Sequence, residues 1–190
     1  MTSPDGHEWS ETKKLAGFGG HYQTSAQRGR TIVTAFNYHP GGSVDKRTNL
    51  YLLRSDDFGK SWKTAAGATV ETPLESKTNA ALVHDYEAEG RMVYIQDVAF
   101  DGDGEPVVLY VLSSGHKPGP QNPARTWYTA RWLSESKTWE RNTVTTSTHN
   151  YDVGALYCEA AEGLAFFEGK GSVVDLEGLV FEGGGFCFES

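Results

Sequence analysis

The stretch Ser-Asp-Asp-Phe-Gly-Lys-Ser-Trp at residues 55–62 decides the fold. It has the pattern S-x-D-x-G-x-x-W, carried by Ser55, Asp57, Gly59 and Trp62. An aspartate at this place accepts hydrogen bonds from the backbone N–H groups of a turn, and the glycine supplies the backbone freedom that the turn needs. The tryptophan then anchors the turn against a sheet. We therefore expect a β-hairpin here, with a structural role for Asp57.

A shorter copy of the pattern lies near the start of the chain. It consists of Ser3, Asp5, Gly6 and Trp9, with one residue fewer between the aspartate and the glycine. The tryptophans of the two copies are 53 residues apart. This period fits one four-stranded propeller blade of about 40–50 residues plus a loop. The segment 132–139 reads as a degenerate third copy, and we expect Trp9 and Trp62 to pack into their blades.

Strand signals dominate the rest of the sequence. Runs rich in β-branched and aromatic residues occupy 31–38, 49–54, 91–100, 106–113, 126–132 and 139–145. No window has a long helical period, so we expect no helix longer than about ten residues between 31 and 146. The prediction is an all-β chain: an incomplete β-propeller of about three four-stranded antiparallel blades over 1–168, with two full blades and a partial one at each end. The Gly-rich, acidic tail 169–190 is predicted to be irregular or a truncated blade.

Composition narrows the partners. The 190 residues carry a formal net charge of -8, which disfavours nucleic acid and anionic membranes as partners. No apolar run reaches the roughly 20 residues of a membrane span, and the first residues have no signal-peptide pattern. Cys158 and Cys187 are the two cysteines, too few for a disulfide framework, and no CxxC pair points to zinc. No cofactor or metal motif is visible, so we expect neither.

Several phrases between and after the two copies resemble one family of propellers. They are GHYQ at 20–23, AFNYH at 35–39, RTNLYLL at 47–53, LYVLSSG at 109–115, RTW at 125–127 and HNYDVGALY at 149–157. With the two patterns above, which are Asp boxes, they resemble the BNR-repeat, sialidase-like propeller family that includes the ulvan lyases. The resemblance covers about residues 3–162 and implies a ligand cleft at the central mouth of a propeller. It further implies an extracellular or periplasmic protein and, as in the characterised lyases, β-elimination of a uronate-containing polysaccharide.

The same resemblance implies a set of site residues. His21, His39, Tyr110 and Arg125 match the catalytic residues in order and approximate spacing. The chemistry requires a cation that neutralises the uronate carboxylate, a group that takes a proton and a group that protonates the leaving oxygen. Arginine suits the first role because its planar fork grips a carboxylate, whereas histidine or tyrosine suits the other two.

Further polar residues accompany this set. Asn37, His149, Asn150 and Tyr151 are candidates for substrate binding. We expect His21, His39 and Arg125 to converge on one end of the propeller, with Tyr110 nearby. Structural roles are the alternatives: hydrogen-bonded histidines, a Tyr110 packed in the core, and a strand turn capped by 149–151. His84 and His116 are expected in exposed loops, and Arg28 and Arg30 are expected to be surface charges.

Three functions follow from these observations. The first is a lyase acting on an acidic polysaccharide. The second is a sialidase-type glycoside hydrolase, which would need a cluster of three arginines, a tyrosine nucleophile and acidic partners. The third is a non-catalytic, glycan-binding propeller. A chain of about three blades leaves the cleft without its remaining walls, so inactivity of the isolated chain is also an open alternative.

Overall fold

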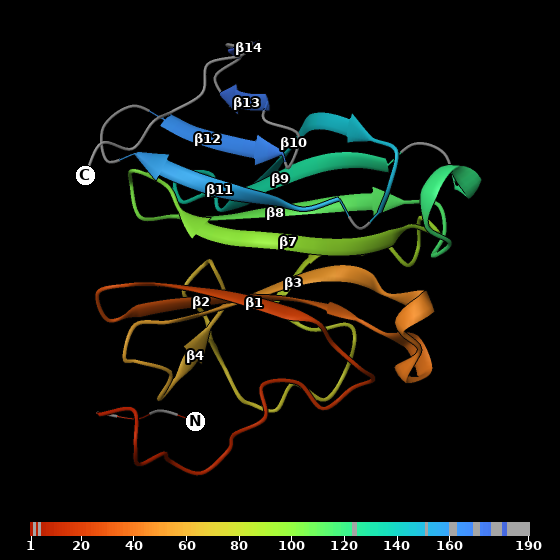
Figure 1. Cartoon of the computed structure of the whole chain (residues 1–190). Helices are drawn as coiled ribbons and strands as arrows, with labels where there is room; N and C mark the ends of the chain where they lie inside the picture. Colours follow the sequence, from red (N-terminus) through yellow and green to blue (C-terminus); the bar gives the residue numbers. More distant parts are fainter. Residues whose placement is uncertain are drawn as a thin grey trace.

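A computed structural model gives the arrangement of the chain (Figure 1). It describes residues 1, 3, 5–122, 125–150, 152–159, 163–168, 172–175 and 180–181. Strands make up all the regular structure of these residues apart from the short 3-10 turns η1 (Pro40–Gly42), η2 (Val44–Lys46) and η3 (Gly119–Gln121). The prediction of an all-β chain is therefore confirmed. Within the same residues, no helix is long and apolar enough to cross a membrane.

The first sheet is built from residues 23–84. Its strands are β1 (Gln23–Arg28), β2 (Thr31–Tyr38), β3 (Thr48–Ser55), β4 (Trp62–Lys63) and β5 (Thr69–Val70), paired in this order. A further short strand, β6 (Leu82–His84), also pairs with β3. All of these pairings are antiparallel, as short connections between consecutive strands require.

Two four-stranded antiparallel sheets follow. Sheet 2 is the meander β7 (Met92–Phe100), β8 (Pro106–Ser113), β9 (Arg125–Leu133) and β10 (Thr138–Ser147). Sheet 3 consists of β11 (Gly154–Glu159), β12 (Gly163–Glu168), β13 (Ser172–Asp175) and β14 (Val180–Phe181). Strands β13 and β14 lie in the tail 169–190, whose other residues are outside the described part of the chain.

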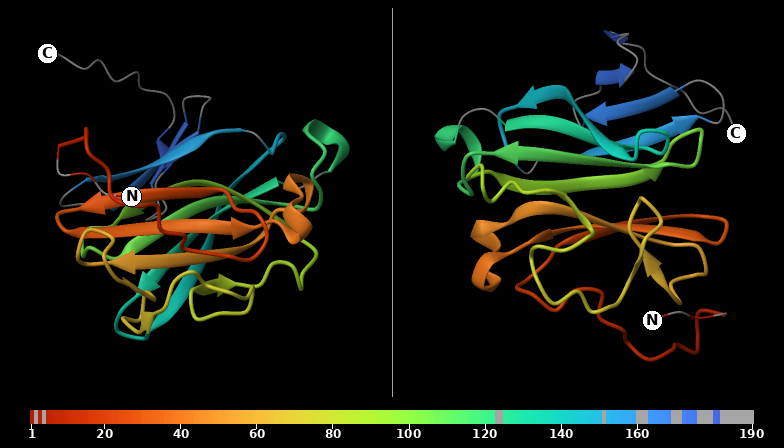
Figure 2. Two further views of the ribbon diagram at one scale, coloured as in Figure 1. Left: turned by 90° about the horizontal axis from the view of Figure 1, so that it is seen from below. Right: turned by 180° about the vertical axis from the view of Figure 1, so that it is seen from behind.

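The three sheets stack face to face like consecutive propeller blades (Figures 1 and 2). The first strand of each sheet is the inner one, because β7 packs against both β1 and β11. The stack is open, so the incomplete propeller expected from the sequence is the fold observed. In a complete propeller these inner strands, β1, β7 and β11, would line the centre.

The cores between the sheets follow from strand alternation. Val33 and Ala35 on β2 face Val108 and Tyr110 on β8, in the core between sheets 1 and 2. Alternate residues of β8 face the core between sheets 2 and 3, so every residue of this strand is buried. That double burial explains the nearly continuous apolar run of β8. Each fully buried valine or leucine contributes about 1.5–3 kcal/mol to folding.

The turn at 55–62 has the geometry of an Asp box. The Asp57 carboxylate accepts hydrogen bonds from the backbone N–H groups of Lys60 (3.0 Å) and Ser61 (2.9 Å) and from the Ser55 hydroxyl (2.8 Å). Hydrogen bonds to the carboxylate lower the pKa of Asp57, and the largest contribution comes from the hydroxyl of Ser61. Gly59 has a φ of 79°, which favours glycine. The indole of Trp62 packs against the cluster on the outer face of sheet 1.

The first Asp box differs from the second. Asp5 accepts bonds from the backbone N–H groups of His7 (2.8 Å) and Glu8 (3.1 Å), so the turn itself is present. The expectation that Trp9 packs into a blade was wrong, because its side chain is 60% exposed. The physical reason is local: among the described residues before β1 no strand forms, and the turn has no sheet beside it for an indole to cover.

Candidate functional site

The loops that carry the candidate residues gather at one end of the stacked sheets. We call this the polar end, formed by 19–22, 38–47, 113–122, Arg125 and 147–150. Strands β2, β8 and β10 end here, whereas β1, β3, β7 and β9 begin here. In Figure 1 it is the right-hand end of the sheets, where the three 3-10 turns lie. Antiparallel pairing thus brings residues more than 100 positions apart to the same side.

His39 is a buried, neutral imidazole at this end. It directly follows β2, and its backbone pairs with that of Gly20 in an isolated bridge. Its side chain is 3% exposed, with the Tyr22 ring 4.8 Å away in an edge-on contact. Burial, reinforced by the charge of Arg47, lowers the pKa of His39 to about 4. Its Nε2 has no hydrogen-bond partner among the described residues, so the lone pair or proton there is uncommitted.

His21 lies two residues before β1, beside the end of β2. Its Nδ1 is 2.7 Å from the carbonyl oxygen of Asn37, which can only accept, so Nδ1 carries the proton. In the neutral ring this leaves a lone pair on Nε2, which has no partner among the described residues. The rings of Phe18 and Phe36 contact the imidazole edge-on at 5.0 and 5.5 Å. Its orientation is therefore fixed on two sides.

Arg47 is a cation at the polar end that sequence reasoning missed. Its guanidinium carbon lies 4.9 Å from the centre of the Tyr22 ring and 4.6 Å from that of Tyr94. The Nε donates to the carbonyl of Val44 at 2.9 Å. Stacking between two rings holds the guanidinium plane in place. The residue stands in the RTNLYLL phrase, but its partners are too distant in sequence to reveal the stack.

Asn37 connects the first two sheets beneath His39. Its side chain is 1% exposed. The Oδ1 accepts a hydrogen bond from the backbone N–H of Tyr22 (2.9 Å), and the Nδ2 donates to the carbonyl of Val93 on β7 (3.1 Å). Both ends of the amide are thus engaged inside the protein. In this arrangement Asn37 fixes the loop that carries Tyr22 rather than facing solvent.

Arg125 and Asn150 anchor the β8–β9 loop. Arg125 is 1% exposed, and its Nη2 donates to the carbonyl of Lys117 at 2.7 Å. Fully buried Asn150 donates to the carbonyl of His116 at 3.3 Å. The Nε of Arg125 and the Oδ1 of Asn150 have no hydrogen-bond partner within the described residues. Both side chains therefore lie below the loop and retain unused hydrogen-bonding capacity.

A comparison of the sequence with models of protein families identifies the family of this chain. The sequence model described as "BNR repeat-containing family member" matches residues 4–147. The chain belongs to the BNR repeat-containing family. This confirms the resemblance found in the sequence.

Solved structures agree on the fold. One described as "Structure of a new family of Polysaccharide lyase PL25-Ulvanlyase" superimposes with a TM-score of 0.57 at 13% sequence identity, covering 82% of this chain. A second, described as that ulvan lyase bound to -[GlcA(1-4)Rha3S]-, matches equally well. The BNR-repeat chain spans 38% of the length of each. A comparison with curated proteins found no match.

Tyr110 lies away from the polar end, in the core between sheets 1 and 2 of this BNR-repeat chain. It is 0% exposed, and burial raises the pKa of its phenol. Its hydroxyl is 2.6 Å from that of Tyr86, to which Arg141 donates at 3.4 Å. Alternation along the strands places Arg125 on the opposite face of sheet 2, with Trp127. The structure therefore does not bring Tyr110 and Arg125 onto a common face.

The remaining candidates divide between the polar end and the surface. His149 lies at the polar end, where its backbone N–H donates to Asp152 (3.2 Å), and Tyr151 falls outside the described residues. His116 is exposed, as expected. The expectation for His84 was wrong, because it is part of β6 and its imidazole is within hydrogen-bonding distance of the Glu89 carboxylate.

Two further features complete the description of the site. Arg28 is exposed but also donates to the carbonyl of Asp101 (3.0 Å), so it links sheets 1 and 2 rather than being a free surface charge. Arg30 is exposed and lies over the ring of Phe58. Among the described residues, no three His, Cys, Asp or Glu side chains lie close enough to hold a metal ion.

Proposed function

We propose that this BNR-repeat chain is the site-bearing part of a polysaccharide lyase that cleaves a uronate-containing polysaccharide by β-elimination. The observation that carries the proposal is the pairing of a neutral histidine, His39, with a ring-stacked guanidinium, Arg47, at the polar end. The similar structures described as an ulvan lyase, one of them bound to a glucuronate–rhamnose sulfate repeat, support the choice of reaction and substrate.

The reaction needs no water and no redox partner. A base takes the proton from carbon-5 of the uronate, the electron pair of that bond forms the carbon-4 to carbon-5 double bond, and the bond from carbon-4 to the bridging oxygen breaks. The leaving oxygen then receives a proton. A cation on the carboxylate stabilises the negative charge that develops next to carbon-5. The enzyme must therefore place one cation and one or two proton-transfer groups around a single sugar ring.

The residues at the polar end match these requirements. Arg47 is a permanently charged group with its plane fixed by Tyr22 and Tyr94, suited to hold the carboxylate. His39 stays neutral at neutral pH, and its Nε2, which is buried and has no partner among the described residues, is the proposed proton acceptor once the side chain is uncovered. His21 presents a second such lone pair from the start of β1 and is the proposed partner in proton transfer.

The other candidates receive supporting roles in the proposal. Arg125 is a second cation for the carboxylate, available when the β8–β9 loop above it is displaced. Tyr110 can donate a proton to substrate only if the core beside Tyr86 opens. In the closed core its role is structural, through the hydrogen bond to Tyr86. His149, Asn150 and Tyr151 are proposed to bind neighbouring sugars. Asn37 is proposed to act indirectly, by holding the loop that carries Tyr22. A protein that degrades such a polymer would work outside the cell or in the periplasm.

The test is the ultraviolet absorbance of the unsaturated uronate. The chain is incubated with a polymer of glucuronate and rhamnose 3-sulfate, and we expect absorbance to rise with time. The variants His39→Ala and Arg47→Ala should abolish the rise, whereas Arg30→Ala, which removes an exposed arginine at the opposite end of β1 and β2, should not. His39→Ala should keep binding, and Arg47→Ala should weaken it.

Two other outcomes would favour the alternatives. New reducing ends without absorbance would indicate a glycoside hydrolase. Saturable binding of the polymer with no product would indicate a non-catalytic glycan-binding propeller, or a chain that needs further blades for turnover. No observation of the described residues favours either over the lyase.

A further inference from the structure

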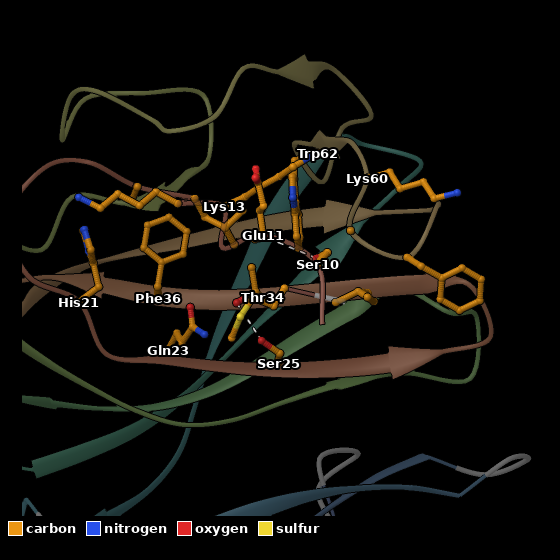
Figure 3. Close-up of a pocket in the computed structure, with 17 residues that line it drawn as sticks. Ser10, Glu11, Lys13, His21, Gln23, Ser25, Thr34, Phe36, Lys60 and Trp62 are labelled. Atoms are coloured by element: carbon orange, nitrogen blue, oxygen red, sulfur yellow. Dashed lines mark hydrogen bonds between the residues drawn. The ribbon is translucent and has the colours of Figure 1, made fainter. Parts of the chain in front are cut away.

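We infer that the BNR-repeat chain has a second saccharide-binding site, a groove on the outer face of sheet 1 that takes an acidic oligosaccharide. The groove has a volume of about 540 Å³ and lies between the segment 10–16 and strands β1 and β2 (Figure 3). This volume is within the range of ligand sites in proteins. The face it occupies is the one turned away from sheet 2, so the groove is separate from the Arg47 stack.

The outer wall of the groove is fixed in place. The carbonyl of Leu15 accepts a hydrogen bond from the backbone N–H of Leu74 (2.9 Å), and Gly17 donates to the carbonyl of Leu74 (2.8 Å). Leu15 and Ala16 also pack against the cluster that contains Phe36. This anchoring holds the end of the segment 10–16 on the sheet, while its earlier residues pass over the groove. The cavity is therefore built by the fold.

The rim of the groove is positively charged in an acidic protein. Lys13, Lys14 and Lys60 line it, with Glu11 as the carboxylate among its lining residues. None of the three lysines forms an ion pair with any described residue. The whole chain carries a net charge of -8, so this excess of free cations is a local feature. Uncommitted ammonium groups around a groove attract an anionic ligand.

The floor of the groove suits a sugar. The half-buried indole of Trp62 supplies flat apolar surface, against which the C–H face of a sugar ring can pack, and Phe36 lies buried beneath the floor, stacked on Tyr51. Gln23 on β1 adds an amide for hydrogen bonds to sugar hydroxyls, and the Ser25 hydroxyl, which donates to Thr34 (3.0 Å), can still accept one. Aromatic surface beside polar donors under a cationic rim favours an anionic saccharide over an apolar ligand, and over a small inorganic anion.

The groove is also elongated and points toward the polar end. His21 stands at one end of it and Lys60 at the other (Figure 3). The floor residues Ile32 and Phe36 alone are about 13 Å apart along β2, from the rise of about 3.3 Å per strand residue. A ligand that fills this length is an oligomer. Its path would bring one end of a bound acidic chain to His21, which lines the groove and is one of the proposed proton-transfer residues.

The choice of an acidic saccharide rests on the proposed function, but binding in the groove does not require turnover. The probe is a tetrasaccharide of glucuronate and rhamnose 3-sulfate, titrated into the 190-residue chain by calorimetry, with a neutral tetrasaccharide of glucose as comparison. The groove variant is Lys13→Gln/Lys60→Gln. Its matched control, Lys77→Gln/Lys137→Gln, removes two exposed charges elsewhere. A third variant, Arg47→Ala, addresses the polar end.

We expect the groove variant to bind the acidic tetrasaccharide about tenfold more weakly than the wild-type chain, and the lysine control to bind unchanged. Raised salt should weaken the wild-type interaction, and the neutral sugar should not compete. Arg47→Ala should retain the groove component of binding. The lysine substitutions are on exposed side chains, so melting temperatures equal to that of the wild-type chain would show that folding is intact.

Three results would overturn the inference. The first is binding that Arg47→Ala abolishes and Lys13→Gln/Lys60→Gln leaves unchanged, which would leave the proposed function standing. The second is the absence of any acidic-saccharide binding by the folded wild-type chain. The third is self-association that the groove variant disrupts while saccharide affinity stays the same, which would make the groove a protein interface. Binding through the groove without polymer cleavage would instead remove the proposed function and keep the groove.

Discussion

Replacement of Asn37 by alanine tests whether this side chain holds the first two sheets together. The change removes two hydrogen bonds, one from the backbone N–H of Tyr22 and one to the carbonyl of Val93. The Val93 carbonyl is left buried without its donor, at a cost of about 1–3 kcal/mol, and the partly buried N–H of Tyr22 adds about 0.5–1.5 kcal/mol. We therefore expect Asn37→Ala to lower the free energy of unfolding by about 1.5–4.5 kcal/mol.

The assay is urea denaturation followed by tryptophan fluorescence, with Asn142→Ala as the control. Asn142 is exposed on β10, so its replacement should change stability by less than about 0.5 kcal/mol. Asn37→Ala should also weaken saccharide binding, because Tyr22 supports both His39 and Arg47. Equal stability of the two variants, with binding lost in Asn37→Ala alone, would refute the structural role and favour direct contact with substrate.

Three further changes have definite expected outcomes. Tyr110→Phe removes the hydroxyl bonded to Tyr86 and should lower the free energy of unfolding by about 0.5–1.5 kcal/mol in the same urea assay, and a loss of turnover at unchanged stability would instead support a catalytic Tyr110. Asp57→Ala should lower the melting temperature, since several turn donors lose their acceptor, without changing saccharide affinity in calorimetry. The folded-state pKa of His39, about 4, lies below the unfolded value of 6.5, so its contribution to stability is present above about pH 6.5 and is lost as pH falls toward 4. The urea midpoint of wild type should therefore drop more over this range than that of His39→Gln. An equal drop in both proteins would show that burial does not lower the pKa of His39.

Much of the fold could be predicted from local sequence signals. The S-x-D-x-G-x-x-W turn at 55–62 is held mainly by hydrogen bonds between its own residues, with one further bond from the backbone N–H of Phe58 to the carbonyl of Arg30. Runs of β-branched and aromatic residues predict the strands, and β8 is predicted by a run that is apolar on both faces. The position of Trp9 could not be predicted in this way. A tryptophan packs only if a sheet lies beside it, and that depends on strands elsewhere in the chain.

The candidate site was harder to predict for a related reason. The antiparallel order brings His21, His39 and Arg125 to the same end, and that follows from strand ends alone. The burial of these side chains cannot be predicted from the strand ends, because it depends on which loops cover them. Arg125, for example, lies beneath the carbonyl of Lys117. Arg47 was missed because its environment is made by Tyr22, just before β1, and Tyr94 on β7, which are distant from it in sequence.

The proposed β-elimination is tested most directly by the origin of oxygen in the products. The chain is incubated with the tetrasaccharide of glucuronate and rhamnose 3-sulfate in heavy-oxygen water, and the products are weighed by mass spectrometry. Elimination transfers a proton and breaks the bond from carbon-4 to oxygen without adding water. The account therefore predicts two unlabelled fragments whose masses sum to that of the substrate, one of them carrying an unsaturated uronate, and neither formed by the His39→Ala variant. Fragments that have gained one labelled oxygen, or an intact tetrasaccharide after prolonged incubation, would contradict it.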